Sequence, residues 1–211
     1  MKRLNRFVLA ALAFSALAFA SITPALNGGA PSLVSPGLYD WSYNIAVDAN
    51  ESLDPSATTN TVCLGGIPCS FGTFFTIYDI PGLITSGING PAGPSGWGSV
   101  VNLTGLTPGG QLLSENSTVF NVTFYYTGAT IGGSIVVTPF SYYSVYGDTT
   151  DGIFSYQATK TQNLTVDQGQ GPILIPQSPS GPLGSVPESA SVLLIGGGLT
   201  ALALVRRWCA R

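Results

Sequence analysis

Residues 117–128, STVFNVTFYYTG, carry the pattern that most restricts the fold of this chain. Every second position from Phe120 to Tyr126 is aromatic or β-branched, and the positions between them include Asn121 and Thr123. Successive side chains of a strand point to opposite faces, so this alternation is typical of a half-buried antiparallel strand. The central part of the chain shows no convincing helical period. The sequence therefore predicts an all-β fold.

Similar runs of aromatic and β-branched residues recur along the chain, and turn signals such as Pro81-Gly82 separate them. About six to nine short strands at this spacing favour an antiparallel β-sandwich, of which a jelly roll is one form. We place this domain at residues 21–167. The further runs are residues 39–47, 73–80, 98–103, 133–147 and 153–166.

The charges of the central part are almost all negative. Nine of the ten acidic residues lie between Asp40 and Asp167, and Lys160 is the only basic residue between Arg6 and Arg206. Nucleic acids bind proteins through Lys and Arg side chains that displace counterions from the phosphates. The charge pattern therefore excludes nucleic acid as a partner.

Histidine is absent from the sequence. This removes the commonest general base and, with it, the Ser-His-Asp triad. Lys160 lies in the polar run QATKTQN, which indicates a solvated face rather than a Ser-Lys dyad. A glycosidase needs only two carboxylates at a set separation, so it stays as the least favoured alternative. We expect no enzymatic activity and no cofactor.

Cysteines and acidic residues give no metal-binding spacing. Cys63 and Cys69 enclose LGGIP, and outside the cytoplasm such a pair predicts a small disulfide ring, with two free thiols as the alternative. The spacing fits no zinc pattern, and we expect no metal. Calcium stays open as an alternative at two acidic groups, Asp48 with Glu51 and Asp54, and Asp148 with Asp151.

The first twenty residues predict a secretory leader. Residues 1–6 are basic, residues 7–20 are mostly small or apolar, and Ala18-Phe19-Ala20 supplies the small residues that a signal peptidase accepts. We expect cleavage between Ala20 and Ser21, which makes Ser21 the first residue of the exported protein. We thus expect an N-terminal signal helix in the precursor, which is removed on export.

The C-terminal part predicts a linker followed by a membrane segment. Residues 168–185 are rich in Gly, Pro and Ser, which favour neither a helix nor a sheet ladder. Residues 190–205 contain no charge, and as a helix they would span about 24 Å. The following Arg206, Arg207 and Arg211 indicate a basic membrane stop on the inner side of the membrane.

The end of the chain resembles the PEP-CTERM sorting signal. The matching positions are Val186-Pro187-Glu188, the apolar residues 193–199 (LLIGGGL) and Arg206-Arg207; the second proline that the family usually has is Ser189 here. The resemblance implies an exosortase-like membrane enzyme as processing partner, transient anchoring in the inner membrane, and a Gram-negative bacterium that makes exopolysaccharide. Two central segments, 74–79 and 154–159, are also similar to an uncharacterised β-rich domain of such sorted proteins.

These features together predict an exported, non-enzymatic protein of the cell surface or extracellular matrix, sorted through residues 186–211. The alternative is a carbohydrate-binding module of the exopolysaccharide matrix. In that case Trp41 and Trp97 are the candidates for stacking on sugar rings, because aromatic side chains offer apolar faces. Filling of a sandwich core is the other interpretation of these two tryptophans.

Overall fold

The computed structural model describes residues 21–56, 72–109, 111 and 113–179. The predicted leader, the pair Cys63 and Cys69, and the sorting signal from Val186 to Arg211 lie outside these residues. The described part contains eleven strands and two short 3₁₀ helices, η1 (Asn27–Gly29) and η2 (Gly87–Asn89). The strands are β1 (Ile22–Leu26), β2 (Ser32–Ser35), β3 (Leu38–Val47), β4 (Glu51–Leu53), β5 (Phe74–Ile77), β6 (Trp97–Asn102), β7 (Asn121–Tyr126), β8 (Ile131–Gly132), β9 (Ile135–Ser144), β10 (Thr149–Lys160) and β11 (Val166–Pro176).

The strands form two antiparallel sheets. In the four-stranded sheet, β3 is central; β9 pairs with one edge, and β1 and β2 follow one another along the other. In the seven-stranded sheet the order is β6-β7-β5-β10-β4-β8, and β11 pairs with the free edge of β10 over its whole length. The prediction of an all-β, antiparallel fold is confirmed.

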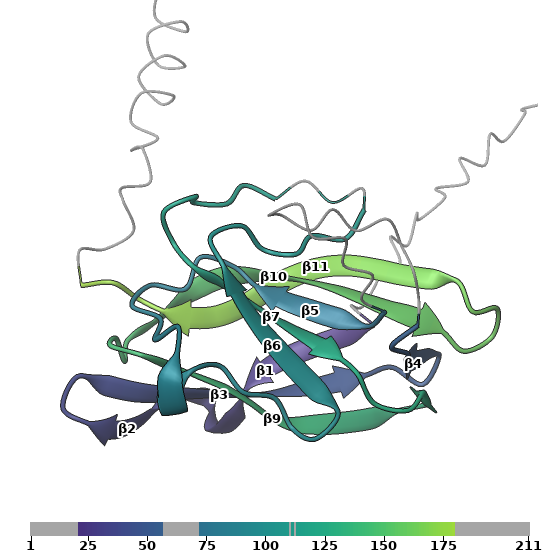
Figure 1. Ribbon diagram of the computed structural model, residues 1–211, viewed down its shortest axis with the longest axis horizontal. Coiled ribbons are helices and arrows are strands. Elements are labelled where there is room, and N and C mark those ends of the chain that lie inside the picture. Colours follow the sequence, from purple (N-terminus) through teal and green to yellow (C-terminus); the bar gives the residue numbers. More distant parts are fainter. Residues whose placement is uncertain (1–20, 57–71, 110, 112, 180–211) are drawn as a thin grey trace, which may run out of the picture.

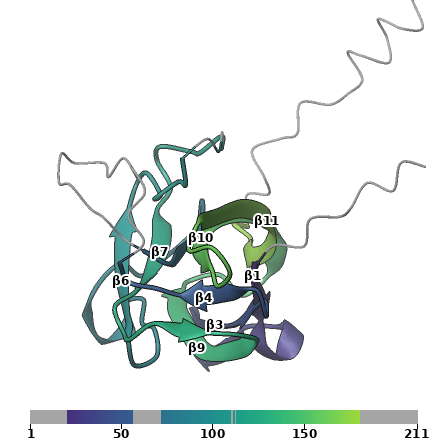
Figure 2. The ribbon, with the colours of Figure 1, turned by 90° about the vertical axis from the view of Figure 1, so that its right-hand side faces the viewer.

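The two sheets enclose one core. Figure 1 shows β3 and β9 below β10 and β11, and the turned view in Figure 2 keeps the two layers apart. Phe140 of β9 joins them, because its ring lies 5.0 Å from that of Phe75 on β5 and 5.3 Å from that of Phe124 on β7. The alternation in residues 39–47 and 117–128 thus places aromatic side chains between the layers, as predicted.

The face of β7 that points away from this core is buried as well. The hydroxyl groups of Thr76 and Thr123 lie 2.8 Å apart, and Thr76 also donates to the carbonyl oxygen of Leu106 at 2.8 Å. The Tyr78 hydroxyl donates to the same carbonyl and lies 2.7 Å from the hydroxyl of Ser155. A half-buried strand was the expectation; β7 differs because the loop at Leu106 covers its second face.

The linker predicted at residues 168–185 is wrong for its first half, because residues 168–176 belong to β11. β11 pairs with β10 in unbroken register, from Val166 opposite Thr159 to Pro176 opposite Thr149. Among the described strands, β11 pairs only with β10, so Pro172 fits on this edge strand without its N–H, and edge strands are the usual place for proline in a sheet. The predicted domain therefore extends beyond residue 167.

Two glycines of β11 leave room for aromatic rings of β10. Gly169 lies opposite Tyr156 and Gly171 opposite Phe154. A Cβ atom at Gly169 would lie 2.6 Å from the Tyr156 ring, and one at Gly171 would lie 2.8 Å from the Phe154 ring. The large rings of β10 thus occupy the space over the glycines of β11, an arrangement that pairs an aromatic side chain with a cross-strand glycine.

In the part of the chain that the structure describes, none of the helices has the length and apolar character needed to cross a membrane. The predicted signal helix and the predicted transmembrane helix at residues 190–205 both lie outside that part.

Candidate binding groove

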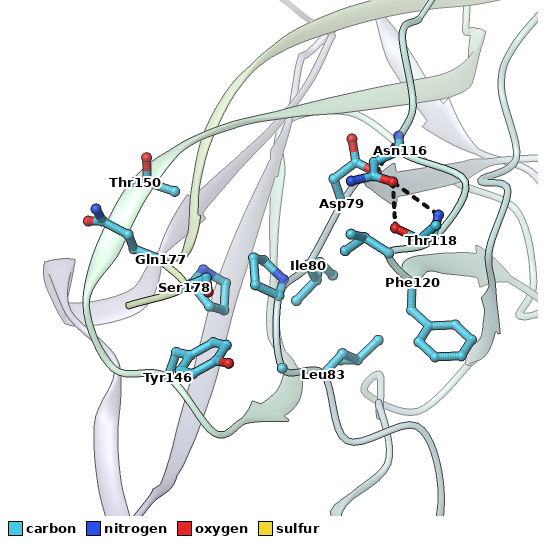
Figure 3. Close-up of a pocket in the computed structure, with 14 residues that line it drawn as sticks. Asp79, Ile80, Leu83, Asn116, Thr118, Phe120, Tyr146, Thr150, Gln177 and Ser178 are labelled. Atoms are coloured by element: carbon cyan, nitrogen blue, oxygen red, sulfur yellow. Dashed lines mark hydrogen bonds between the residues drawn. The ribbon is translucent and has the colours of Figure 1, made fainter. Parts of the chain in front are cut away.

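A groove of about 760 Å³ lies where five segments of the chain meet (Figure 3). These are residues 79–83 after β5, residues 116–120 before β7, Tyr146 after β9, Thr150 at the start of β10, and residues 176–178 at the end of β11. Volumes of several hundred Å³ are typical of sites that hold small ligands. The groove is therefore the candidate functional site.

Backbone hydrogen bonds hold the walls of the groove together. The amide of Ile80 donates to the carbonyl of Phe120 at 2.9 Å, and the amide of Val145 donates to the carbonyl of Gly82 at 3.0 Å. The indole Nε1 of Trp41 donates to the carbonyl of Tyr146 at 3.0 Å, which ties this wall to the core. Because segments distant in sequence are bonded directly to one another, the groove is preformed.

Gly82 allows two of these segments to approach closely. Its φ of +65° lies in the left-handed region, which side chains other than glycine rarely adopt. A Cβ atom here would lie 2.6 Å from Cγ2 of Val145 and 2.8 Å from Cδ2 of Tyr146. The Pro81-Gly82 turn signal in the sequence thus marks the point where Tyr146 can form the groove wall only because residue 82 has no side chain.

Asp79 is the acidic residue of the groove lining. It has a positive φ of 51°, and its amide donates to Oδ1 of Asn121 at 2.6 Å. Its own Oδ1 accepts a hydrogen bond from the amide of Asn116 at 2.9 Å. Burial raises the pKa of this carboxyl above its ordinary value, and the Asn116 hydrogen bond partly offsets the rise. A carboxyl held in this way can accept hydrogen bonds from a ligand.

Polar and apolar groups are segregated along the groove. Figure 3 shows Thr150 and Gln177 at one side and Asp79 at the other, with Ile80 between them. The rings of Tyr146 and Phe120 lie on opposite sides of the apolar floor; Phe120 is 39% exposed. The arrangement offers aromatic and aliphatic faces for stacking, together with carboxyl, amide and hydroxyl groups for directional hydrogen bonds.

The stacking role considered as an alternative for Trp41 and Trp97 is wrong. Trp41 is fully buried and stacks on Tyr142 at a centroid distance of 6.3 Å. Trp97 is 9% exposed and meets Phe140 edge-on at 4.8 Å. Since neither ring offers a free face, both tryptophans fill the core, as the other interpretation of the sequence held.

The other residues singled out in the sequence fall into three groups. Ser21 is described, and its backbone and side chain both make contacts (below). Within the described ranges, the acidic residues considered for calcium form no cluster of three or more that could hold a metal ion. Several residues lie outside those ranges: Ala20, Cys63, Cys69, Val186, Pro187, Glu188, Ser189, Arg206, Arg207 and Arg211.

Sequence reasoning missed the groove. Phe120 was placed on the inward face of its strand, but β7 begins only at Asn121, so the Phe120 side chain escapes the core. Tyr146, Thr150 and Gln177 carried no signal of their own. The turn at Pro81-Gly82 was the one visible sign, and it could not show which other segments would meet there.

No known protein family, no curated protein and no solved structure matches this chain.

Proposed function

We propose that this chain is an exported, non-enzymatic β-sandwich protein of the cell surface or extracellular matrix, sorted through its C-terminal residues. The supporting observation is the order of parts along the chain. The first strand begins at Ile22, directly after the predicted cleavage site, and the last ends at Pro176, ten residues before Val186. The folded domain thus fits between a leader and a PEP-CTERM-like signal, with residues 177–185 as a short linker.

Processing by an exosortase-like enzyme is tested by comparing the mass of the exported protein in strains with and without that enzyme. We expect loss of residues after Pro187-Glu188 only where the enzyme is present. Glu188→Gln should abolish processing, and Ser189→Pro, which restores the usual second proline, should raise the processed fraction. An exported protein that keeps its tail in both strains would rule out this sorting route.

We further propose that the domain binds a carbohydrate of the exopolysaccharide matrix in the groove. The observation that favours this is the combination of Tyr146 and Phe120 with the polar groups Asp79, Gln177 and Thr150 along one open surface. Sugar rings present C–H faces that stack on aromatic rings, and hydroxyl groups that need directional partners. This proposal moves the binding role from the two tryptophans to the groove.

Glycan-array binding, followed by calorimetry with a glycan that binds, tests this proposal on the exported protein. We expect Phe120→Ala and Tyr146→Ala each to weaken binding by roughly three- to tenfold, as for loss of one stacked ring. Val136→Ala is the matched control, because Val136 is exposed on β9 and does not line the groove. Binding that survives both aromatic substitutions would place the glycan elsewhere.

A glycosidase remains the least favoured candidate. Among the residues that line the groove, Asp79 has the only carboxyl group, whereas hydrolysis of a glycosidic bond needs two. A second carboxylate, Asp151, lies with Asp79 on an adjoining hollow of about 200 Å³. Release of reducing sugar from a bound glycan, abolished by Asp79→Asn and by Asp151→Asn, would contradict the non-enzymatic proposal.

A further inference from the structure

Ser21, the predicted first residue of the exported protein, is held by both its backbone and its side chain. Its amide donates to the hydroxyl of Tyr156 at 2.9 Å, and its carbonyl accepts a hydrogen bond from the amide of Asp48 at 2.9 Å. Its hydroxyl donates to Oδ2 of Asp167, to which the Tyr156 hydroxyl also donates at 3.2 Å. The Ser21 nitrogen is therefore linked to the Asp167 carboxylate through the Tyr156 hydroxyl, and the Ser21 hydroxyl is bonded to that carboxylate directly.

A hollow of about 290 Å³ adjoins Ser21 and is lined by charged groups from two further strands. Glu51 of β4 and Lys160 of β10 both face it, and Nζ of Lys160 lies 3.2 Å from Oδ1 of Asp167. Asp48 and the polar residues Asn50, Gln162 and Asn163 line the hollow as well. The ammonium group of Lys160 thus already has Asp167 as its ion-pair partner.

Glu51 has one carboxyl oxygen without a partner. The residue is 3% exposed, and its Oε2 atom has no hydrogen-bond donor among the residues that the structure describes. Burial, followed by the nearby Asp167, raises the pKa of this carboxyl to about 7, although Lys160 and a hydrogen bond with Ser21 lower it. A buried carboxylate without a matching cation is costly, so the site as it stands is one positive charge short.

We propose that the α-ammonium group of Ser21, created when the leader is removed, binds at the edge of this hollow and pairs with the carboxylates of Glu51 and Asp167. The inference rests on the leader cleavage in the proposed function. Hydrolysis of the Ala20–Ser21 bond consumes one water molecule, breaks the C–N bond and leaves an amine on Ser21, which takes up a proton at neutral pH. The same atom that donates one hydrogen bond as an amide then donates three and carries a positive charge.

The exported domain would have very few positive charges, so the α-ammonium group is a large part of its total. Lys160 is the only basic side chain between Arg6 and Arg206, so the α-ammonium is the second cation of the entire domain. Its arrival would place a second cation beside Glu51 and Asp167, in addition to Lys160. Leader removal would thereby complete the junction of β1 with β4, β10 and β11, and the exported form would be more stable than the precursor.

The hollow is remote from the groove. Thr150 lines the groove and Lys160 lines the hollow, and both belong to β10, on which ten residue steps span roughly 33 Å. Substitutions at the hollow should therefore leave glycan binding in the groove unchanged.

The test exploits the scarcity of amines. In the exported protein the only amines are the α-amine and Lys160, so Lys160→Arg leaves a single amine while it keeps the positive charge. Mass spectrometry first establishes that the exported chain begins at Ser21. Competitive labelling with acetic anhydride over a range of pH then gives the pKa of the α-amine, which is about 8 in an exposed terminus.

We expect this pKa to lie at least about one unit above that of a peptide with the sequence SITPAL, so that labelling at pH 8 is about tenfold slower. Glu51→Gln and Asp167→Asn should each bring the rate back toward that of the peptide, whereas Asp148→Asn, an exposed carboxylate elsewhere, should not. Acetylation of the α-amine should lower the melting temperature, and less so in the Glu51→Gln variant.

Two results would overturn the inference, and they differ in meaning. A chain that begins at a residue other than Ser21 removes the predicted cleavage site and the inference together. A chain that begins at Ser21 but labels like the free peptide agrees with the proposed leader cleavage and refutes only the ion pair. If Glu51→Gln does not fold, the wild-type α-amine pKa decides alone, because the ordinary value of about 8 contradicts the proposal.

Discussion

At the scale of single residues, Gly82 decides whether the groove keeps its shape. Alanine at this position must adopt a φ of +65° and meets Val145 and Tyr146 at 2.6 and 2.8 Å. We expect Gly82→Ala to lower the free energy of unfolding by at least about 1 to 2 kcal/mol and to weaken glycan binding through a displaced Tyr146.

The control for this substitution is Gly109→Ala. A Cβ atom at Gly109 would have no neighbour within 4 Å, so alanine there should change stability by less than about 0.5 kcal/mol. Urea unfolding and glycan calorimetry on both variants make the comparison. Equal behaviour of the two variants would show that the close approach at Gly82 does not maintain the groove.

We expect Glu51 to make the protein less stable as the pH rises, whereas most carboxylates of folded proteins have the opposite effect. Its pKa is raised from an ordinary 4.5 to about 7 when the Ser21 nitrogen is an amide. Between these values the folded state holds a proton that the unfolded state has released, so stability falls as the pH rises through this window. We expect protein with an acetylated α-amine to lose on the order of 1 to 3 kcal/mol between pH 4.5 and 7.5.

Unfolding in urea across this pH range measures the effect. Glu51→Gln should remove the decline, because the amide does not titrate. Protein with a free α-amine should show a smaller decline, since the ammonium favours the ionised carboxylate. A decline that persists unchanged in Glu51→Gln would assign the pH dependence to another group.

At the scale of elements, β11 depends on its glycines for packing rather than for flexibility. Valine has the higher β-propensity, so Gly171→Val would stabilise the strand if propensity decided. The Phe154 ring instead occupies the space over Gly171 at 2.8 Å, and we expect Gly171→Val to cost about 1 to 3 kcal/mol.

Gln170→Val is the matched substitution, because Gln170 is the exposed neighbour on the same strand. It should leave stability within about 0.5 kcal/mol or raise it slightly. Thermal unfolding of both variants separates the two explanations. A Gly171→Val protein as stable as the Gln170→Val protein would mean that Phe154 moves aside without cost.

The contrast between β3 and β11 shows what the sequence could predict at this scale. β3 was predicted because its alternating Trp41 and Tyr43 reveal a buried face without knowledge of any partner. β11 was read as a linker because its prolines and glycines disfavour a strand in isolation. β11 forms a strand because it lies at the edge of the sheet and because the aromatic rings of β10 lie over its glycines. Both conditions depend on the neighbouring strand, which the sequence of β11 alone does not show. The groove was unpredictable for the same reason, since its walls come from segments almost one hundred residues apart.

At the scale of the whole molecule, Phe140 and Phe120 distinguish the core from the groove. Phe140 is fully buried, and its ring contacts those of Phe75, Phe124 and Trp97 on three strands of the opposite sheet. We expect Phe140→Ala to cost about 3 to 5 kcal/mol, because it opens a cavity where the two sheets meet. Phe120 is 39% exposed, so Phe120→Ala should cost less than about 1.5 kcal/mol.

The two substitutions should therefore affect different properties of the protein. Phe140→Ala should lower the melting temperature strongly while the folded fraction still binds glycan, because the ring does not line the groove. Phe120→Ala should leave the melting temperature nearly unchanged and weaken glycan binding. Differential scanning calorimetry and glycan titration on both variants measure this. A Phe120→Ala protein that is as unstable as Phe140→Ala would mean that the groove wall is part of the core, and that its aromatic side chains are present for packing rather than for a ligand.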